Sequence, residues 1–204
     1  MPAAITCQSI VTPDGPLTPG VVLIGDDGRI VEAGPAPHVP EGAQIVDLPD
    51  ATLVPGFIDL HVHGGGGFSL ATRNPEEIFS YARWVVSHGV TSFLPTICAG
   101  SIDEGLEFVR TAARATGHVD GGATVLGVNL EGPFVNPARR GALPVGWITP
   151  AALPVFDRLA EAADGKLRVM TLAPELPGAM DVLKAAVARG TAVSGSWVSP
   201  YSRC

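Results

Sequence analysis

Residues 54–67 read VPGFIDLHVHGGGG, and this stretch decides the fold. An apolar run of strand length leads into His61 and His63, and four glycines follow. Because alternate residues of a strand point to the same face, both imidazoles are expected on one side of it. The glycines would let a ligand approach the backbone closely. The pattern therefore predicts a strand that delivers two imidazoles to a ligand site at its carboxyl end.

Runs of strand length alternate with stretches of helical period from residue 51 onward. The further strand runs lie at residues 91–95, 124–130, 167–172 and 191–194. The helix-start signals between them are Asn74-Pro75, Ser101, Thr149-Pro150 and Pro177. This alternation predicts an α/β fold with about four βα units plus a fifth strand, packed around a parallel sheet, over residues 51–194.

The two ends of the chain do not follow this alternation. Residues 1–50 contain short strand-like runs, with Asp27-Gly28 as a hairpin turn, and they predict a small β module. Residues 195–204 have no helical period and form a polar tail. We therefore expect three segments, namely the β module, the α/β part and an unrelated tail.

Composition disfavours several classes of binding partner. The chain has 204 residues, 13 basic and 20 acidic side chains and a net charge of -7. Such a charge, without a basic stripe, disfavours nucleic-acid and anionic-membrane partners. The cysteines, Cys7, Cys98 and Cys204, are too few and too widely spaced for a disulfide framework, which favours a reducing cytoplasm. No apolar run reaches the length of a membrane-spanning helix.

A second candidate ligand follows the strand run at 124–130. Glu131 stands where that strand ends, so its carboxylate is expected at the same rim as His61 and His63. Imidazole nitrogens beside a carboxylate oxygen suit zinc, iron or manganese, and a carboxylate could bridge two such ions. Two alternatives stay open: the histidines could be surface residues at a loop entrance, and Glu131 could pair with Arg139 or Arg140.

Four sequence blocks together resemble a known family. They are VPGFIDLHVHG at 54–64, TSFLPT at 91–96, LEGPFVNP at 130–137 and TLAPE at 171–175. The first, after a small β module, resembles the amidohydrolase superfamily. The combination is similar to the N-acetylglucosamine-6-phosphate deacetylase family, with a match from the N-terminus to about Ser194.

This resemblance implies a fold, an activity and a set of site residues. The fold would be part of a (β/α)8 TIM-like barrel preceded by part of a β-sandwich module. The activity would be metal-dependent conversion of N-acetylglucosamine 6-phosphate, a small sugar phosphate, to glucosamine 6-phosphate and acetate. Glu131 would be the principal ligand of the divalent metal, with His61 and His63 at an additional metal position. A homo-oligomer would be in keeping with the family.

The sequence departs from the family pattern in two places. At the family's substrate-binding position the chain has Ala142-Leu143 where a histidine usually follows the small residue, and Leu143 cannot donate that hydrogen bond. After Ser194 the family's metal histidines do not appear, and its catalytic aspartate would lie beyond residue 204. We therefore assign no catalytic residue and expect a truncated, impaired copy, as a frameshift would produce. The alternatives are another amidohydrolase acting on a cyclic amide, or a non-catalytic remnant.

Overall fold

The computed structural model describes residues 2–35 and 37–195, and the chain divides into two compact units between Pro55 and Gly56. The polar tail predicted at 195–204 therefore lies, from residue 196 onward, outside the described residues. Among those that are described, no helix has the length and apolar character needed to cross a membrane. Each unit is described separately below.

The first unit is a mainly antiparallel sheet around one long strand. Its strands are β1 (Ala3–Thr12), β2 (Gly15–Leu17), β3 (Gly20–Ile24), β4 (Ile30–Gly34) and β5 (Gln44–Leu53). β1 pairs antiparallel with β2 and β3 and parallel with β5, while β4 pairs antiparallel with β3. The predicted hairpin between β3 and β4 is confirmed, and Gly28 takes a φ of 75°, which glycine adopts without strain.

The core of this first sheet is small. Its buried apolar cluster consists of Cys7, Ile10 and Val22. By contrast, Ile30 and Val31 on β4 are 69% and 70% exposed. The described residues of this unit form one sheet, and the sandwich predicted from the sequence stays a prediction.

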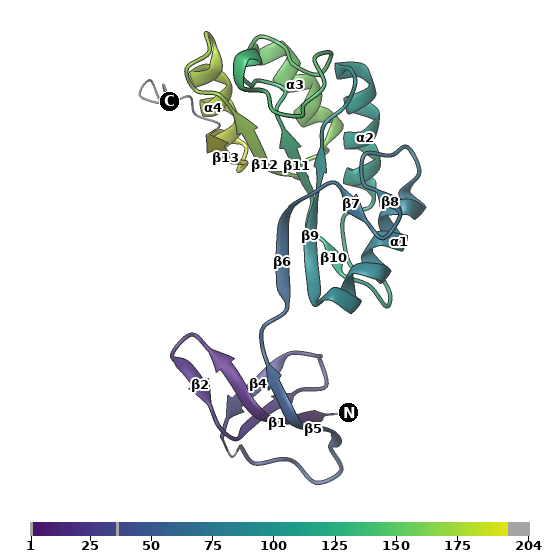
Figure 1. Cartoon of the computed structure of the whole chain (residues 1–204), viewed down its shortest axis with the longest axis vertical. Coiled ribbons are helices and arrows are strands. Elements are labelled where there is room, and N and C mark those ends of the chain that lie inside the picture. The colour runs from purple at the N-terminus through teal and green to yellow at the C-terminus, as the bar shows by residue number, and fades with distance from the viewer. Residues whose placement is uncertain (1, 36, 196–204) are drawn as a thin grey trace. The chain divides into compact units, whose positions relative to one another are not determined.

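The second unit is built on a parallel sheet (Figure 1). Its strands are β6 (Phe57–Val62), β9 (Val90–Ile97), β10 (Thr124–Val125), β11 (Val128–Glu131), β12 (Leu167–Leu172) and β13 (Ala192–Gly195). β9 pairs with β6 on one side and with both β10 and β11 on the other, and β12 and β13 follow β11. The strand predicted at 124–130 is thus interrupted near Gly127, whose φ is 143°.

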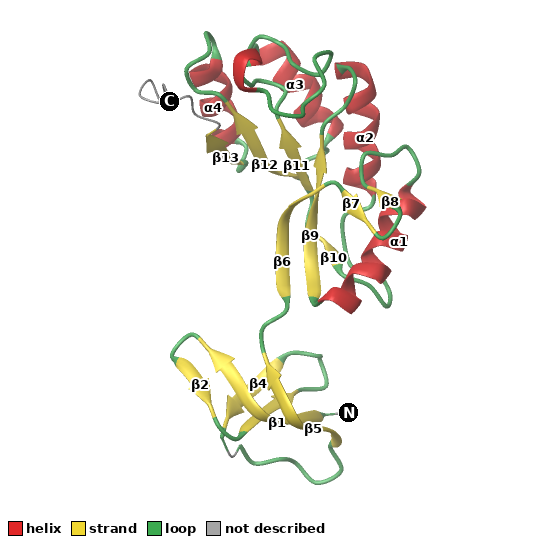
Figure 2. Cartoon of the chain, viewed as in Figure 1, coloured by secondary structure: helices red, strands yellow, loops and turns green. Residues whose placement is uncertain are grey.

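Helices connect successive strands and cover the outer side of this curled sheet (Figure 2). They are α1 (Pro75–Val85), α2 (Ile102–Arg114), α3 (Leu153–Ala162) and α4 (Ala179–Ala188). Short elements complete the unit: the hairpin of β7 (Gly64–Gly65) and β8 (Phe68–Ser69), and the 3-10 turns η1 (Val86–His88) and η2 (Pro137–Arg139). Four βα units and a fifth strand are present, which confirms the predicted α/β half-barrel.

The helix starts show where local sequence signals decide the structure. The predicted caps Asn74 and Ser101 are confirmed, because each side chain accepts a hydrogen bond from a backbone N–H of the first helical turn. The starts predicted at Thr149 and Pro177 are wrong by a few residues. The backbone N–H of Thr149 bonds to Pro133 in the preceding loop, and Gly178 has a left-handed φ of 79°, so each helix begins later.

The main core lies between the sheet and its helices. Four aromatic side chains in it, Phe93, Phe134, Trp147 and Phe156, are fully buried. They come from β9, from the loop that follows β11 and from α3. The core thereby fixes both the sheet and the loop that leaves β11 at Glu131.

Candidate metal centre

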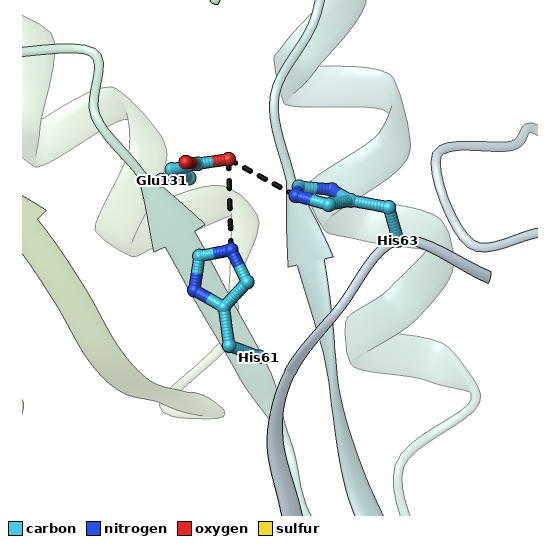
Figure 3. Close-up of side chains that lie close together, drawn as sticks. All are labelled: His61, His63 and Glu131. Carbon is cyan, nitrogen blue, oxygen red and sulfur yellow. Dashed lines mark ion pairs between the residues drawn. The ribbon is translucent and has the colours of Figure 1, made fainter. Parts of the chain in front are cut away.

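Three side chains meet at the carboxyl ends of β6 and β11 (Figure 3). The Nε2 atoms of His61 and His63 lie 3.7 and 3.0 Å from Oε2 of Glu131. One ligand atom from each residue lies within 4.8 Å of the other two. The side chains are 50%, 45% and 29% exposed, respectively, so the cluster is accessible to an ion.

His63 is held in one orientation by β9. Its Nδ1 lies 3.0 Å from the backbone oxygen of Thr96, and because a carbonyl only accepts, Nδ1 carries the proton. Nε2 is the atom that faces Glu131, and it is the ring nitrogen left to bind a metal ion. The ring of His61 stands nearly perpendicular to that of His63, at 82° and a centroid distance of 5.2 Å. Fixing the second ring nitrogen in this way is typical of metal-ligating histidines.

The strand that carries the histidines leaves the regular ladder just before them. Pairing between β6 and β9 shifts register between Asp59 and Val62. In this interval the backbone N–H of Val62 donates to Oγ1 of Thr96 at 3.0 Å, and that of His61 donates to Oδ1 of Asp59 at 3.1 Å. The carbonyl of Leu60 accepts a hydrogen bond from Nδ2 of Asn129, on β11, at 2.8 Å. Side chains thus take the place of ladder hydrogen bonds next to the cluster.

Sequence reasoning missed two of these hydrogen-bonding residues, Asn129 of β11 and Thr96 of β9. Both are buried, at 2% and 0% exposure, and the structure pairs them across the β9–β11 ladder. One signal could have found Asn129. It is a polar residue in an apolar strand, two positions before Glu131 and so on the same face.

Asp59 faces away from the imidazoles. It pairs with Phe93, and residues paired across a ladder share a face of the sheet. The ring of Phe93 packs against Tyr81 of α1 at a centroid distance of 4.9 Å. Burial, and secondarily the charge of Asp59, raise the pKa of Tyr81, in keeping with a carboxylate on the helix side. Asp59 is therefore a poor candidate for a base acting on the metal-site side.

The predicted substrate positions lie in the loop after η2. Ala142 is exposed, whereas the side chain of Leu143 is buried in the main core. The backbone oxygen of Leu143 accepts a hydrogen bond from the Arg140 guanidinium at 2.6 Å. A role of this loop in substrate binding stays a prediction, and the exposed backbone at Ala142 is its more accessible part.

A buried tryptophan anchors the loop that follows Glu131. The indole Nε1 of Trp147 donates to the backbone oxygen of Glu131 at 2.7 Å. The ring lies against Gly105 of α2, so closely that a methyl group at Gly105 would collide with it. Contact with α2 therefore helps to fix the backbone of the glutamate.

We expect Gly105→Ala to lower the free energy of unfolding by about 1–3 kcal/mol, because the new methyl group overpacks the site. Helix propensity alone would give the opposite sign, a gain of about 1 kcal/mol. Urea denaturation measures the change. In a Trp147→Leu background the same substitution should cost much less, since the ring is gone. Equal losses in both backgrounds would show that Trp147 is not the obstacle.

Cys98 lies just beyond β9, where burial and the charge of Glu131 both affect the pKa of its thiol. Burial raises the pKa of its thiol, and the negative charge of Glu131 raises it further. Among the described residues, the ligand atoms that cluster belong to His61, His63 and Glu131, and Cys98 is therefore left out of the candidate ligand set.

The three clustered side chains fit a divalent metal ion. Two imidazole nitrogens and one carboxylate oxygen are a donor set suited to zinc, iron or manganese. Because Nδ1 of His63 bonds to the carbonyl of Thr96, Nε2 is the nitrogen that could bind the ion. The structure therefore supports the coarser expectation of a divalent-metal site, whatever the ion.

Comparison with known proteins places these features in a family. A model of the amidohydrolase family matches residues 52–197. N-acetylglucosamine-6-phosphate deacetylase of Bacillus subtilis is 34% identical over 170 residues, which are 82% of this chain and 43% of that protein. The Homo sapiens protein of the same name is 40% identical over 148 residues, covering 70% of this chain and 36% of the relative.

A solved structure agrees with these matches. It is the N-acetyl-D-glucosamine-6-phosphate deacetylase of Mycobacterium smegmatis in complex with N-acetyl-D-glucosamine-6-phosphate. The TM-score is 0.83 at 29% identity, over 95% of this chain and 49% of that chain. The chain thus spans about half the length, or less, of the relatives that it matches. By the match over residues 52–197, the chain belongs to the amidohydrolase family.

Proposed function

We propose that this chain carries the metal-binding part of a hydrolase that removes the acetyl group from N-acetylglucosamine 6-phosphate, giving glucosamine 6-phosphate and acetate. The observation that carries the proposal is the convergence of His61, His63 and Glu131 at the strand ends. The deacetylase names of the similar proteins support the choice of substrate. Zinc, iron or manganese would be held by these three residues.

We assign roles to the individual residues as follows. A bound metal ion would polarise the acetyl carbonyl and activate a water molecule. Glu131 and the two imidazoles would hold the ion, and Thr96 would keep the Nε2 lone pair of His63 directed at it. The loop at Ala142 and Leu143 would contact the sugar phosphate.

The described cluster contains no second carboxylate to accept a proton from that water. Asp59 faces the helix side of the sheet, and Glu131 is committed as a ligand. General acid–base assistance is typically worth about 10²–10⁴-fold in rate. We infer that these 204 residues alone hydrolyse the amide slowly.

The proposal includes the cellular compartment, the kind of partner and the oligomeric state. Free Cys7 and Cys98 are compatible with a reducing cytoplasm. A net charge of -7 favours a small-molecule partner over nucleic acid or an anionic membrane. Formation of a homo-oligomer is a further prediction, which sedimentation analysis would test.

A substrate comparison tests the proposed activity. Metal-loaded protein should slowly release acetate from N-acetylglucosamine 6-phosphate and leave a cyclic amide such as dihydroorotate intact, in line with the names of the similar proteins. Radiolabelled acetate and separation of the ring-opened product give both rates. Ring opening without acetate release would favour the cyclic-amide alternative. No reaction with either compound, in protein shown to contain metal, would favour a non-catalytic role.

A further inference from the structure

Two buried polar side chains attach the histidine-bearing strand β6 to β9 and to β11. We propose that Thr96 and Asn129 are positioning residues that set the spacing between the imidazoles and the Glu131 carboxylate. The inference rests on the proposed metal site and deepens it, since it concerns how the chain holds that site together. Neither residue belongs to the ligand cluster itself.

Asn129 ties together two strands that are not neighbours. In the sheet, β9 lies between β6 and β11, yet Nδ2 of Asn129 on β11 donates to the carbonyl of Leu60 on β6 at 2.8 Å. The amide orientation is determined, because only Nδ2 can donate to a carbonyl. Asn129 lies two residues before Glu131, and Leu60 immediately precedes His61. This one hydrogen bond therefore connects the segments that carry the carboxylate and the first imidazole.

Thr96 holds the next part of the same segment from the intervening strand. Its Oγ1 accepts the backbone N–H of Val62 at 3.0 Å, and its backbone oxygen accepts from Nδ1 of His63 at 3.0 Å. Because Val62 lies between the two histidines, the hydroxyl fixes their backbone while the carbonyl fixes one ring. Thr96 and Asn129 are paired in register, so the two attachments act side by side.

The burial of Asn129 indicates that its presence is not explained by a contribution to stability alone. Its side chain is 2% exposed, and Oδ1 has no hydrogen-bond partner among the described residues. Leaving a buried acceptor unpaired is costly, and an apolar side chain of similar size would avoid that cost. The hydrogen bond to Leu60 is what an apolar residue could not supply. A role in positioning the adjacent ligands explains why an amide stands there.

The test compares metal binding in matched variants of the whole chain. Asn129→Leu removes the bond to Leu60 and Thr96→Val removes the bond to the Val62 N–H, each with little change of volume, and Thr96→Ser keeps the hydroxyl. Thr111→Val is the control, because Thr111 is also buried but bonds within α2, to the carbonyl of Glu107. Zn²⁺ affinity is measured by competition with a chelator, the visible absorption of bound Co²⁺ reports ligand geometry, and circular dichroism verifies folding.

We expect Asn129→Leu and Thr96→Val each to bind Zn²⁺ about 10–100-fold more weakly, the usual effect of losing a group that orients a metal ligand. Their Co²⁺ spectra should change, whereas Thr96→Ser and Thr111→Val should match the parent. A purely structural role would lower stability without altering the Co²⁺ spectrum. Affinities and spectra equal to those of Thr111→Val would overturn the proposal. If Asn129→Leu fails to fold, Asn129→Ser, too short to reach Leu60, replaces it with the same expectation.

A metal-free measurement separates this inference from the metal site. Amide hydrogen exchange at Val62 should be slow in the parent, because its N–H donates to Oγ1 of Thr96, and faster in Thr96→Val. Asn129→Leu should likewise speed exchange in the segment that follows Leu60. Exchange unchanged in both variants contradicts the positioning role. A parent protein that protects these amides but binds no Zn²⁺ contradicts the proposed function and leaves the attachment itself supported.

Discussion

Glu131→Gln should weaken divalent-metal binding by more than about 100-fold. Loss of a group that only orients a metal ligand costs up to about 100-fold in affinity, and loss of a ligand itself should cost more. Glu131 supplies the carboxylate of the described cluster, and its Oε2 faces both imidazoles. A glutamine keeps the size of the side chain but replaces an anionic oxygen with a neutral one. Elemental analysis of protein purified without chelator, followed by a competition titration with Zn²⁺, measures the loss.

Glu175→Gln is the matched control. Glu175 also lies in a loop that follows a barrel strand, but its carboxylate accepts a hydrogen bond from Asn136 at 3.1 Å and lies outside the cluster. This variant should retain the metal content of the parent. If the two variants retain equal amounts of metal, Glu131 is not a ligand.

Acetate release from N-acetylglucosamine 6-phosphate by these 204 residues should be at least about 10²–10⁴-fold slower than ordinary enzymatic turnover. The reason is the absence of a second carboxylate from the described cluster, since a metal site without a proton acceptor forgoes that factor. The assay uses protein loaded in turn with zinc, iron and manganese, with Glu131→Gln as the background rate. Turnover of about 1–10³ s⁻¹, lost in Glu131→Gln, would mean that a group outside the described cluster accepts the proton.

Much of the second unit could be predicted because its signals are local. Asn74 and Ser101 cap their helices as their side chains allow, and the alternation of apolar runs matches the order of strands and helices. The later helix starts could not be predicted, since they depend on contacts made across the fold. Thr149 is held by a hydrogen bond to Pro133, sixteen residues earlier in the chain.

For the site, sequence reasoning found the ligands but not their supports. His61 and His63 are recognisable because strand period places them together, and Glu131 because it ends an apolar run. Thr96 and Asn129 act through hydrogen bonds to the backbone of a distant strand. Such bonds depend on where the ladder between β6 and β9 shifts register, and a register shift leaves no mark in the residue types.

The position of β6 has a consequence for thermodynamic linkage. Within the described sheet β6 pairs with β9 alone, and Ile58 and Leu60 are 61% and 53% exposed. An edge strand of this kind opens locally at a low free-energy cost. The measured dissociation constant for the ion would then be the intrinsic one divided by the fraction of molecules with β6 closed. Metal binding should in turn stabilise the closed form of β6, the strand that leads to two of the ligands. Amide hydrogen exchange along β6 should therefore become slower when the ion is bound.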